Sequence, residues 1–136
     1  MYDDESNNER SGSRRYVSVA LFRKPNAPAV KIGPAMEMIQ AGATLLDVRD
    51  RTEWNTGHAP GALHIPLSQV AAQASKRLPK GRPVIVACKS GSRARMAAKT
   101  LAEQGVDARV LSGGMTAWES AGGRVVNKSN REGIIQ

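Results

Sequence analysis

Short apolar runs alternate with helix-forming segments through most of this chain. The most apolar run, PVIVAC at residues 83–88, is typical of a central strand that is buried on both faces. A glycine-containing loop follows it, and then a segment rich in strong helix formers at 93–104. Strands that alternate with helices pair in parallel, so the pattern predicts an α/β fold with a mostly parallel central sheet and helices on both faces.

The remaining elements are predicted from apolar spacing and from the glycines and prolines at their ends. Besides 83–88, strands are expected at 44–48, 62–66 and 108–111. Helices are expected at 34–41, 50–57, 67–78, 93–104 and 115–121. The apolar stretch Tyr16–Phe22 is a candidate for an added strand, which Pro25 and Pro28 would end.

The chain has 136 residues, which fits one compact domain. Residues 1–15 contain almost no apolar side chains and are predicted to be a disordered N-terminal tail. The domain is expected over 16–126, and the polar residues 127–136 are expected to be a loosely held C-terminal tail. The net charge of the chain is +8. Residues 1–15 carry a net charge of −1, so residues 16–136 carry a net charge of +9.

Cys88 is the only cysteine of the chain. A single thiol excludes an internal disulfide and a multi-cysteine zinc site, and it suits a reducing compartment. No apolar run approaches the roughly 18 residues that a membrane helix needs. The acidic N-terminus also differs from a signal peptide. We therefore expect a soluble, cytoplasmic protein with no membrane partner.

In a parallel sheet, ligands bind at the edge where the carboxyl ends of the strands meet. Asp47 and Cys88 leave their predicted strands at this edge. The residues between Cys88 and the next helix form a short polar loop of Lys89, Ser90, Gly91, Ser92 and Arg93. This composition distinguishes Cys88 from an ordinary cysteine of an apolar strand, which is usually an inert, buried small side chain.

Each part of this loop favours an anion at the sulfur of Cys88. Gly91 permits a curled backbone whose N–H groups face one point, and the helix that follows presents its positive end. Lys89 and Arg93 add positive charge, and Ser90 and Ser92 can donate hydrogen bonds. We expect a thiol so placed to lose its proton at neutral pH and to act as a nucleophile.

Two other uses of such a loop are weighed against this one. A loop with Gly, Lys and Ser could cradle a nucleotide phosphate, but the motif G-x-x-x-x-G-K-[ST] is absent. Phosphatases that form a phosphocysteine use Cys-x5-Arg, whereas four residues separate Cys88 from Arg93 and Ala94 stands at the phosphatase arginine position. The shorter loop better fits one extra sulfur atom than a tetrahedral phosphate.

Three segments resemble the rhodanese family of single-domain sulfurtransferases. Residues 45–66, LLDVRDRTEWNTGHAPGALHIP, resemble its entry motif, and residues 84–94, VIVACKSGSRA, resemble its active loop Cys-x-x-Gly-x-Arg. Residues 110–126, VLSGGMTAWESAGGRVV, resemble its closing Gly-Gly and Trp segment. The resemblance covers residues 34–126, and the three motifs follow the family's order, which makes it specific.

The resemblance implies a rhodanese-like fold with a five-stranded, mostly parallel sheet and a Cys88 that cycles between thiolate and persulfide. It implies a small anionic sulfur donor such as thiosulfate, an external acceptor that is a thiol, a protein or cyanide, and no cofactor. The backbone amides of residues 89–93 would stabilise the persulfide, while Lys89 and Arg93 would attract the donor. A sulfur-carrier module, an arsenate reductase and a phosphatase are the alternatives within the superfamily.

The other motif residues are interpreted mainly as structural. Asp47 and Arg49 match the family's Asp-x-Arg and are expected to brace loops through hydrogen bonds. Glu53 is expected to pair with a nearby backbone group or cation, and His58 to fix a turn. His64 could face either way, and no spacing of histidines and acids indicates a metal site.

The pI near 10.3 raises the question of nucleic-acid binding. The basic residues are scattered and have no aromatic residues interleaved among them, which argues against it. Attraction of an anionic sulfur donor or of an acidic protein partner explains the charge more simply. The sequence does not indicate an oligomeric state.

Overall fold

The computed structural model of the chain describes residues 27–136, in which five strands form one sheet. The strands are β1 (Ala29–Val30), β2 (Thr44–Asp47), β3 (Leu63–His64), β4 (Val84–Ala87) and β5 (Ala108–Leu111). Their order across the sheet is β1-β5-β4-β2-β3, and every neighbouring pair is parallel. The predicted five-stranded α/β sheet is confirmed, and within the described residues it is wholly parallel.

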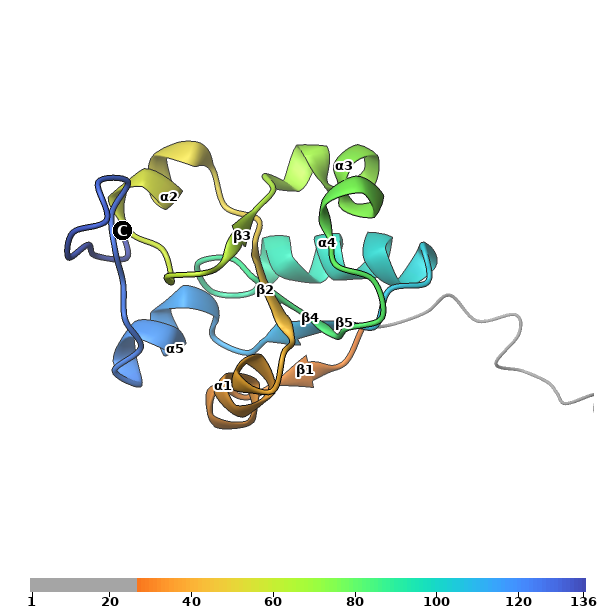
Figure 1. The fold of residues 1–136 in the computed structure, drawn as a ribbon, viewed down its shortest axis with the longest axis horizontal. Coiled ribbons are helices and arrows are strands. Elements are labelled where there is room, and N and C mark those ends of the chain that lie inside the picture. The colour runs from red at the N-terminus through yellow and green to blue at the C-terminus, as the bar shows by residue number, and fades with distance from the viewer. Residues whose placement is uncertain (1–26) are drawn as a thin grey trace, which may run out of the picture.

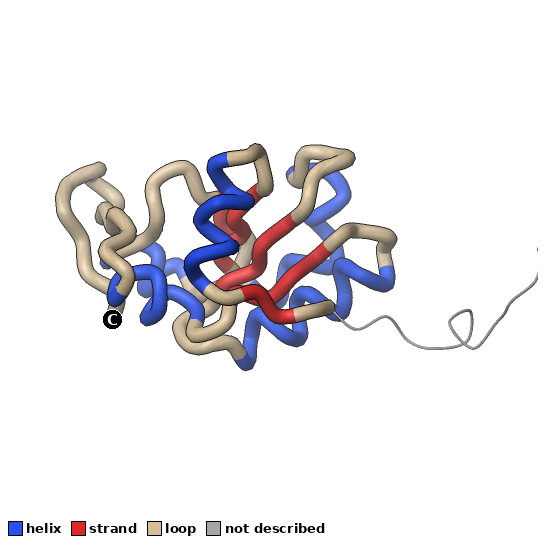
Figure 2. Tube along the Cα trace, turned by 90° about the horizontal axis from the view of Figure 1, so that it is seen from below, coloured by secondary structure: helices blue, strands red, loops and turns tan. Residues whose placement is uncertain are grey.

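Helices cover both faces of this sheet. They are α1 (Ile32–Gln40), α2 (Arg51–Thr56), α3 (Val70–Arg77), α4 (Ser92–Glu103) and α5 (Gly114–Ser120), with a 3-10 turn (Leu67–Gln69) before α3. Helices α3 and α4 lie on one side of the sheet, and α1 and α5 lie on the other (Figure 1). Figure 2, turned to look from below, shows strands running side by side with helical segments around them.

The alternation of side chains along β4 divides the core into two layers. Val84 and Val86 pack with α3 and α4, whereas Ile85 and Ala87 pack with α1 and α5. All four residues of β4 are buried, as expected for the central strand of a parallel sheet. Cys88 continues the alternation and belongs to the layer beneath α3 and α4.

The predicted elements occur in the predicted order, with ends that differ by at most two residues, except that the first three residues of the helix predicted at 67–78 form a 3-10 turn. The first described strand, β1, was not predicted because two residues carry no periodic signal. The candidate strand Tyr16–Phe22 and the predicted tail at residues 1–15 lie outside the described residues.

The prediction of a loosely held segment at 127–136 is wrong. The amide of Lys128 donates to the carbonyl of Asn55 (2.9 Å), and that of Ile134 donates to the carbonyl of Thr56 (3.2 Å), so the segment is tied to α2. Ile135 packs against the core layer of α1 and α5. The polar sequence of the segment gave no sign of this packing, because backbone hydrogen bonds and one apolar side chain hold the segment in place.

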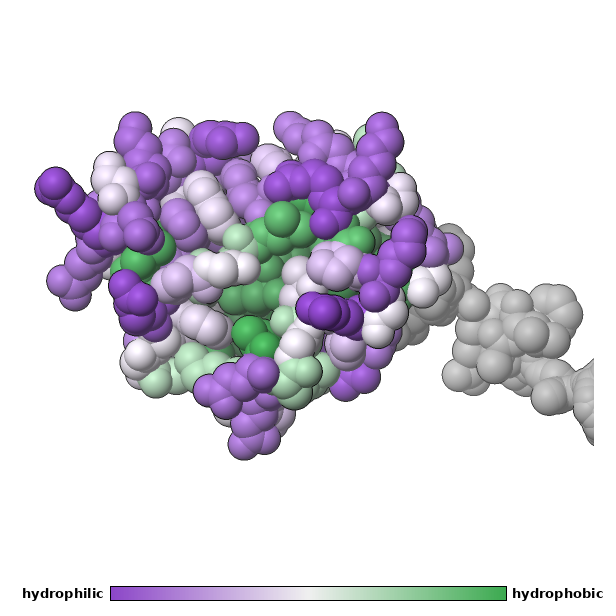
Figure 3. Space-filling view, viewed as in Figure 1, coloured by the Kyte–Doolittle hydropathy of each residue, from purple (hydrophilic) through white to green (hydrophobic). Residues whose placement is uncertain are grey.

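No helix in residues 27–136 is long and apolar enough to cross a membrane. In the space-filling view, hydrophobic residues gather in a hollow near the middle of the face and hydrophilic residues surround them (Figure 3). A groove of about 440 Å³ runs past Leu45 of β2 and Leu63 of the edge strand β3.

Candidate active site

Cys88 directly follows β4 and is only 1% exposed. Its Sγ accepts a hydrogen bond from the backbone N–H of Gly91, with 3.0 Å between N and Sγ. Gly91 has a φ of +140°, a conformation that residues with a Cβ rarely adopt. The glycine therefore lets the backbone curl so that an amide faces the sulfur.

The rest of the predicted loop lies mostly at the surface. Lys89, Ser90 and Ser92 are exposed, while Gly91 is buried. Helix α4 begins at Ser92, and the amide of Arg95 donates to the carbonyl of Gly91 (3.0 Å). The positive end of a twelve-residue helix thus starts at the loop, which favours negative charge there.

Helix α5 holds the loop from the other side, a contact that the sequence analysis missed. The amide of Met115 donates to the carbonyl of Cys88 (2.8 Å), and that of Thr116 donates to the carbonyl of Lys89 (3.1 Å). Gly114 makes this approach possible, because a Cβ there would overlap both carbonyl groups. The pair Gly113-Gly114 shortly after β5 was the available signal, but the sequence analysis used it only as part of the closing motif of the resemblance.

Arg93 turns toward α2 and pairs with Glu53. Its Nη1 donates a hydrogen bond to Oε1 of Glu53 (2.6 Å), and its Nη2 donates one to Oε2 (3.0 Å). Oε1 also accepts a hydrogen bond from the backbone N–H of Asp50 (3.1 Å). The hydrogen bonds from Arg93 lower the pKa of Glu53, and the bond to Glu53 raises the pKa of Arg93. The expected cation partner of Glu53 is therefore Arg93, whose own charge is balanced.

Asp47 and Arg49 form a fully buried ion pair under the site. Asp47 lies opposite Ala87 in the β2–β4 register, one residue before Cys88. Both guanidinium nitrogens Nε (3.0 Å) and Nη2 (2.7 Å) donate to the carboxylate, and Nη2 also donates to the carbonyl of Gly57 (2.6 Å). These contacts tie the end of β2 to the residue after α2, and the bracing role expected for the pair stays a prediction.

Trp54 lies between two histidine rings. Its ring stacks on His58 with centroids 3.6 Å apart and on His64 with centroids 4.7 Å apart. The Nδ1 of His58 bonds to the carbonyl of Trp54 (2.7 Å), and the Nε2 of His64 bonds to the carbonyl of Arg49 (2.7 Å). The stack involves the neighbour of Glu53 in α2, and sequence spacing alone gave no sign of it.

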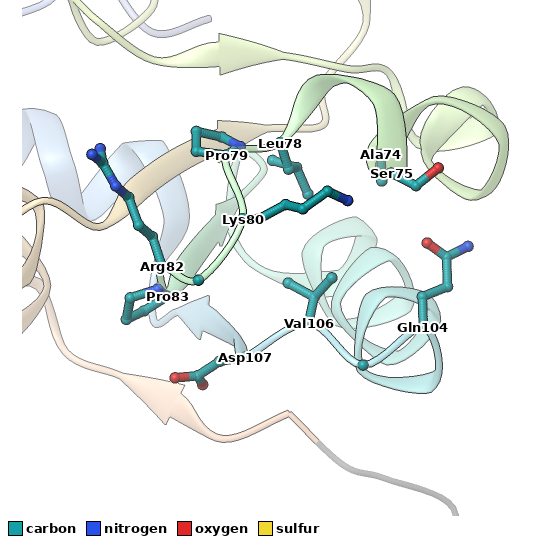
Figure 4. Close-up of a pocket in the computed structure, with 12 residues that line it drawn as sticks. Ala74, Ser75, Leu78, Pro79, Lys80, Arg82, Pro83, Gln104, Val106 and Asp107 are labelled. Atoms are coloured by element: carbon teal, nitrogen blue, oxygen red, sulfur yellow. The ribbon is translucent and has the colours of Figure 1, made fainter.

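Two hollows flank the sheet at opposite edges. A cavity of about 520 Å³ lies away from Cys88, between Leu78, Lys80 and Val106 (Figure 4). A groove of about 310 Å³ adjoins the active loop and is lined by Ser90 and Gly91. Within residues 27–136, no group of three or more His, Cys, Asp or Glu residues is placed to hold a metal ion.

Comparison with known proteins matches residues 33–121 to the rhodanese-like domain. The chain is 38% identical over 80 residues to a sulfurtransferase of Allochromatium vinosum, covering 57% of this chain and 73% of that protein. It is 41% identical over 61 residues to a putative sulfur carrier protein of Bacillus subtilis, covering 45% of this chain and 32% of the relative.

A solved thiosulfate sulfurtransferase from Pseudomonas aeruginosa is 27% identical, with a TM-score of 0.68 over 80% of this chain and 21% of that one. The fold and the site define a parallel α/β domain that carries a cysteine in a curled loop at the carboxyl edge of its sheet. The chain belongs to the rhodanese-like family, which confirms the resemblance seen in the sequence. It spans about a third of the length of the Bacillus carrier protein.

Proposed function

We propose that this chain is a sulfurtransferase that accepts a sulfane sulfur on Cys88 as a persulfide and passes it to an external acceptor. The contact between the Gly91 amide and Sγ carries the proposal, since an N–H already directed at the sulfur stabilises negative charge there without reorganisation. Membership of the rhodanese-like family supports the same chemistry.

The transfer has two displacement steps. With thiosulfate as donor, the Cys88 thiolate attacks the outer sulfur, the S–S bond of thiosulfate breaks, and sulfite leaves with the bonding electrons. A nucleophilic acceptor, either a thiol or cyanide, then attacks the outer sulfur of the persulfide, and Cys88 leaves as a thiolate. Because Cys88 is the only cysteine, no second thiol of the chain can resolve the persulfide.

The cations of the loop have different parts in this proposal. Exposed Lys89 draws the anionic donor toward the site. Arg93, paired with Glu53, keeps the loop curled around Sγ, while the buried Asp47–Arg49 pair braces the strand end beside it. A reducing cytoplasm would keep Cys88 available as a thiol between turnovers.

A sulfur-carrier role is the second candidate. The similarity to a protein named as a putative sulfur carrier favours it, and so does the burial of Cys88, which would protect a persulfide from small thiols. Such a module would receive sulfur from a partner enzyme and deliver it to another protein. Phosphatase and arsenate reductase activities are disfavoured by the four-residue spacing between Cys88 and Arg93.

Thiocyanate formation from thiosulfate and cyanide separates these functions. We expect turnover by the wild-type chain and none by Cys88→Ser. Equal inactivity of the two proteins would contradict the free-standing enzyme, and a persulfide formed only with a partner desulfurase would assign the carrier role. Hydrolysis of phosphate esters that depends on Cys88 would instead support a phosphatase.

A further inference from the structure

The cavity of about 520 Å³ lies at the amino edge of the sheet, at the opposite end of β4 from Cys88. Helices α3 and α4 end beside it, and the segment 78–83, which joins α3 to β4, forms its rim. Figure 4 shows Leu78 and Val106 on either side of the Lys80 side chain. The four residues of β4 span about 13 Å, so the cavity and the sulfur lie at different ends of the sheet.

The rim of this cavity is strongly basic. Between residues 76 and 82 no side chain is acidic and four are cationic: Lys76, Arg77, Lys80 and Arg82. All four are exposed, and none forms an ion pair with a carboxylate in the described part of the chain. Asp107 also lines the cavity, but its carboxylate is paired with Arg109 (3.2 Å). The cations of the rim are therefore available to a charge from outside.

The helix ends at this edge neutralise only part of the charge. The C-terminus of a helix carries about half a negative charge, and α3 and α4 both end here, so together they offset about one of the four cations. Arg77 donates from Nη1 to the carbonyl of His64 (2.8 Å), a neutral group that leaves the charge of the guanidinium unbalanced. The rim therefore keeps a net charge of about +3.

We propose that this edge is a docking surface for a partner protein that presents an acidic peptide segment with a large apolar side chain. The apolar side chain enters the cavity and contacts Leu78 and Val106, while neighbouring carboxylates pair with Lys80 and Arg82. The cavity favours a peptide over nucleic acid, because no aromatic side chain among residues 27–136 lines it to stack on a base.

Docking at the amino edge leaves the cysteine loop open. Because Cys88 lies at the other end of β4, a partner held here raises the local concentration of what it delivers without covering the sulfur. The contact itself involves no sulfur chemistry, so binding at this edge can be measured whether or not Cys88 carries a persulfide.

Fluorescence anisotropy of labelled synthetic peptides measures this docking on the full chain. The probe Asp-Glu-Asp-Leu-Phe-Asp-Glu-Asp places acidic residues around two apolar ones, and a matched probe has Ser-Ser in place of Leu-Phe. We expect the first probe to bind about tenfold more tightly than the second. A variant with both Lys80→Glu and Arg82→Glu should bind the first probe at least about tenfold more weakly than the wild type does.

A second double variant, Arg51→Glu with Lys128→Glu, is the matched control. It makes the same charge change at exposed residues that do not line the cavity, and we expect it to keep the wild-type affinity within about twofold. Amide NMR locates the bound probe, with shifts expected at Leu78, Gln104 and Val106 and none at Gly91 beside the sulfur.

Equal affinity for the two probes, equal weakening by the two double variants, or shifts outside the cavity and its rim would overturn the proposal. Tighter binding of poly(U) RNA than of the acidic probe at the same residues would overturn it in favour of a nucleic-acid partner. The variant with Lys80→Glu and Arg82→Glu should form thiocyanate at the wild-type rate, because the cavity lies away from Cys88. A wild-type chain that binds the probe but forms no thiocyanate would contradict the free-standing enzyme alone.

Discussion

Arg93 and Arg95 lie two residues apart at the start of α4, yet their charges meet different surroundings. The Arg93 guanidinium pairs with Glu53. The carboxylate of Glu53 also accepts a hydrogen bond from the backbone N–H of Asp50. Arg95 is exposed and lies over Gly91. At the scale of single residues, one cation is therefore held in an ion pair and the other is exposed.

The Glu53–Arg93 pair predicts a pH-dependent stability. Because hydrogen bonds from Arg93 lower the pKa of Glu53 in the folded chain, its contribution is complete above the unfolded pKa and is lost as the pH falls through the folded one. Glu53→Gln should cost about 1 kcal/mol at pH values above about 5, and the difference from wild type should shrink as the pH falls below the unfolded pKa of Glu53. Urea unfolding at several pH values measures it.

Glu37→Gln is the control for this measurement, since Glu37 is an exposed carboxylate on α1. We expect it to leave the pH dependence of stability unchanged. A stability difference for Glu53→Gln that stays constant from about pH 3 to about pH 7 would contradict a charged pair at this place.

At the scale of elements, strand β4 and helices α4 and α5 meet at the active loop. Strand β4 ends at it, α4 begins beside it, and the first amides of α5 bond to the carbonyls of Cys88 and Lys89. Gly114, with a φ of +54° and no space for a Cβ, is the residue that allows α5 to come this close.

Gly114→Ala and Gly122→Ala separate steric overlap from backbone strain. Both glycines have positive φ, but a Cβ at Gly122 meets no atom within 4 Å, whereas one at Gly114 overlaps the active loop. We expect Gly122→Ala to cost about 1 kcal/mol and Gly114→Ala more than about 3 kcal/mol, with loss of sulfur transfer. Thermal unfolding and the thiocyanate assay measure the two effects, and equal costs would contradict the contact between α5 and the loop.

The sequence was sufficient to predict elements whose signals are local. Apolar runs bounded by glycine and proline predicted the order of strands and helices, and with it the place of Cys88 at the end of β4. The partner of Arg93 was not predicted, because Glu53 lies 40 residues away and no local pattern joins the two. The stacking of Trp54 between two histidines depends in the same way on how distant segments pack.

At the scale of the whole molecule, the C-terminal segment closes the domain over α2. Val126 pairs with His58 through two backbone hydrogen bonds of 2.9 Å and 2.8 Å. Gly57 has no Cβ, and one built there would overlap the carbonyl of Ile134. The segment thereby secures the helix that carries Glu53, far along the chain from the active loop.

Two neighbouring isoleucines test this closure. Ile135 packs against the core layer of α1 and α5, whereas Ile134 is 64% exposed. We expect Ile135→Ala to lower the free energy of unfolding by about 1–2 kcal/mol and Ile134→Ala to change it by less than about 0.5 kcal/mol. Chemical denaturation of both variants measures the difference. Equal, small effects would contradict a packed C-terminal segment.

The most direct test of the proposed function is the intact mass of the chain after treatment with thiosulfate and removal of excess reagent. We expect the wild-type chain to gain about 32 Da, the mass of one sulfur atom, and to lose it on addition of cyanide. Cys88→Ser should keep its original mass throughout. A wild-type chain that gains no mass with thiosulfate or with any other sulfane donor, or a Cys88→Ser variant that gains as much as the wild type, would contradict Cys88 as the sulfur-carrying residue.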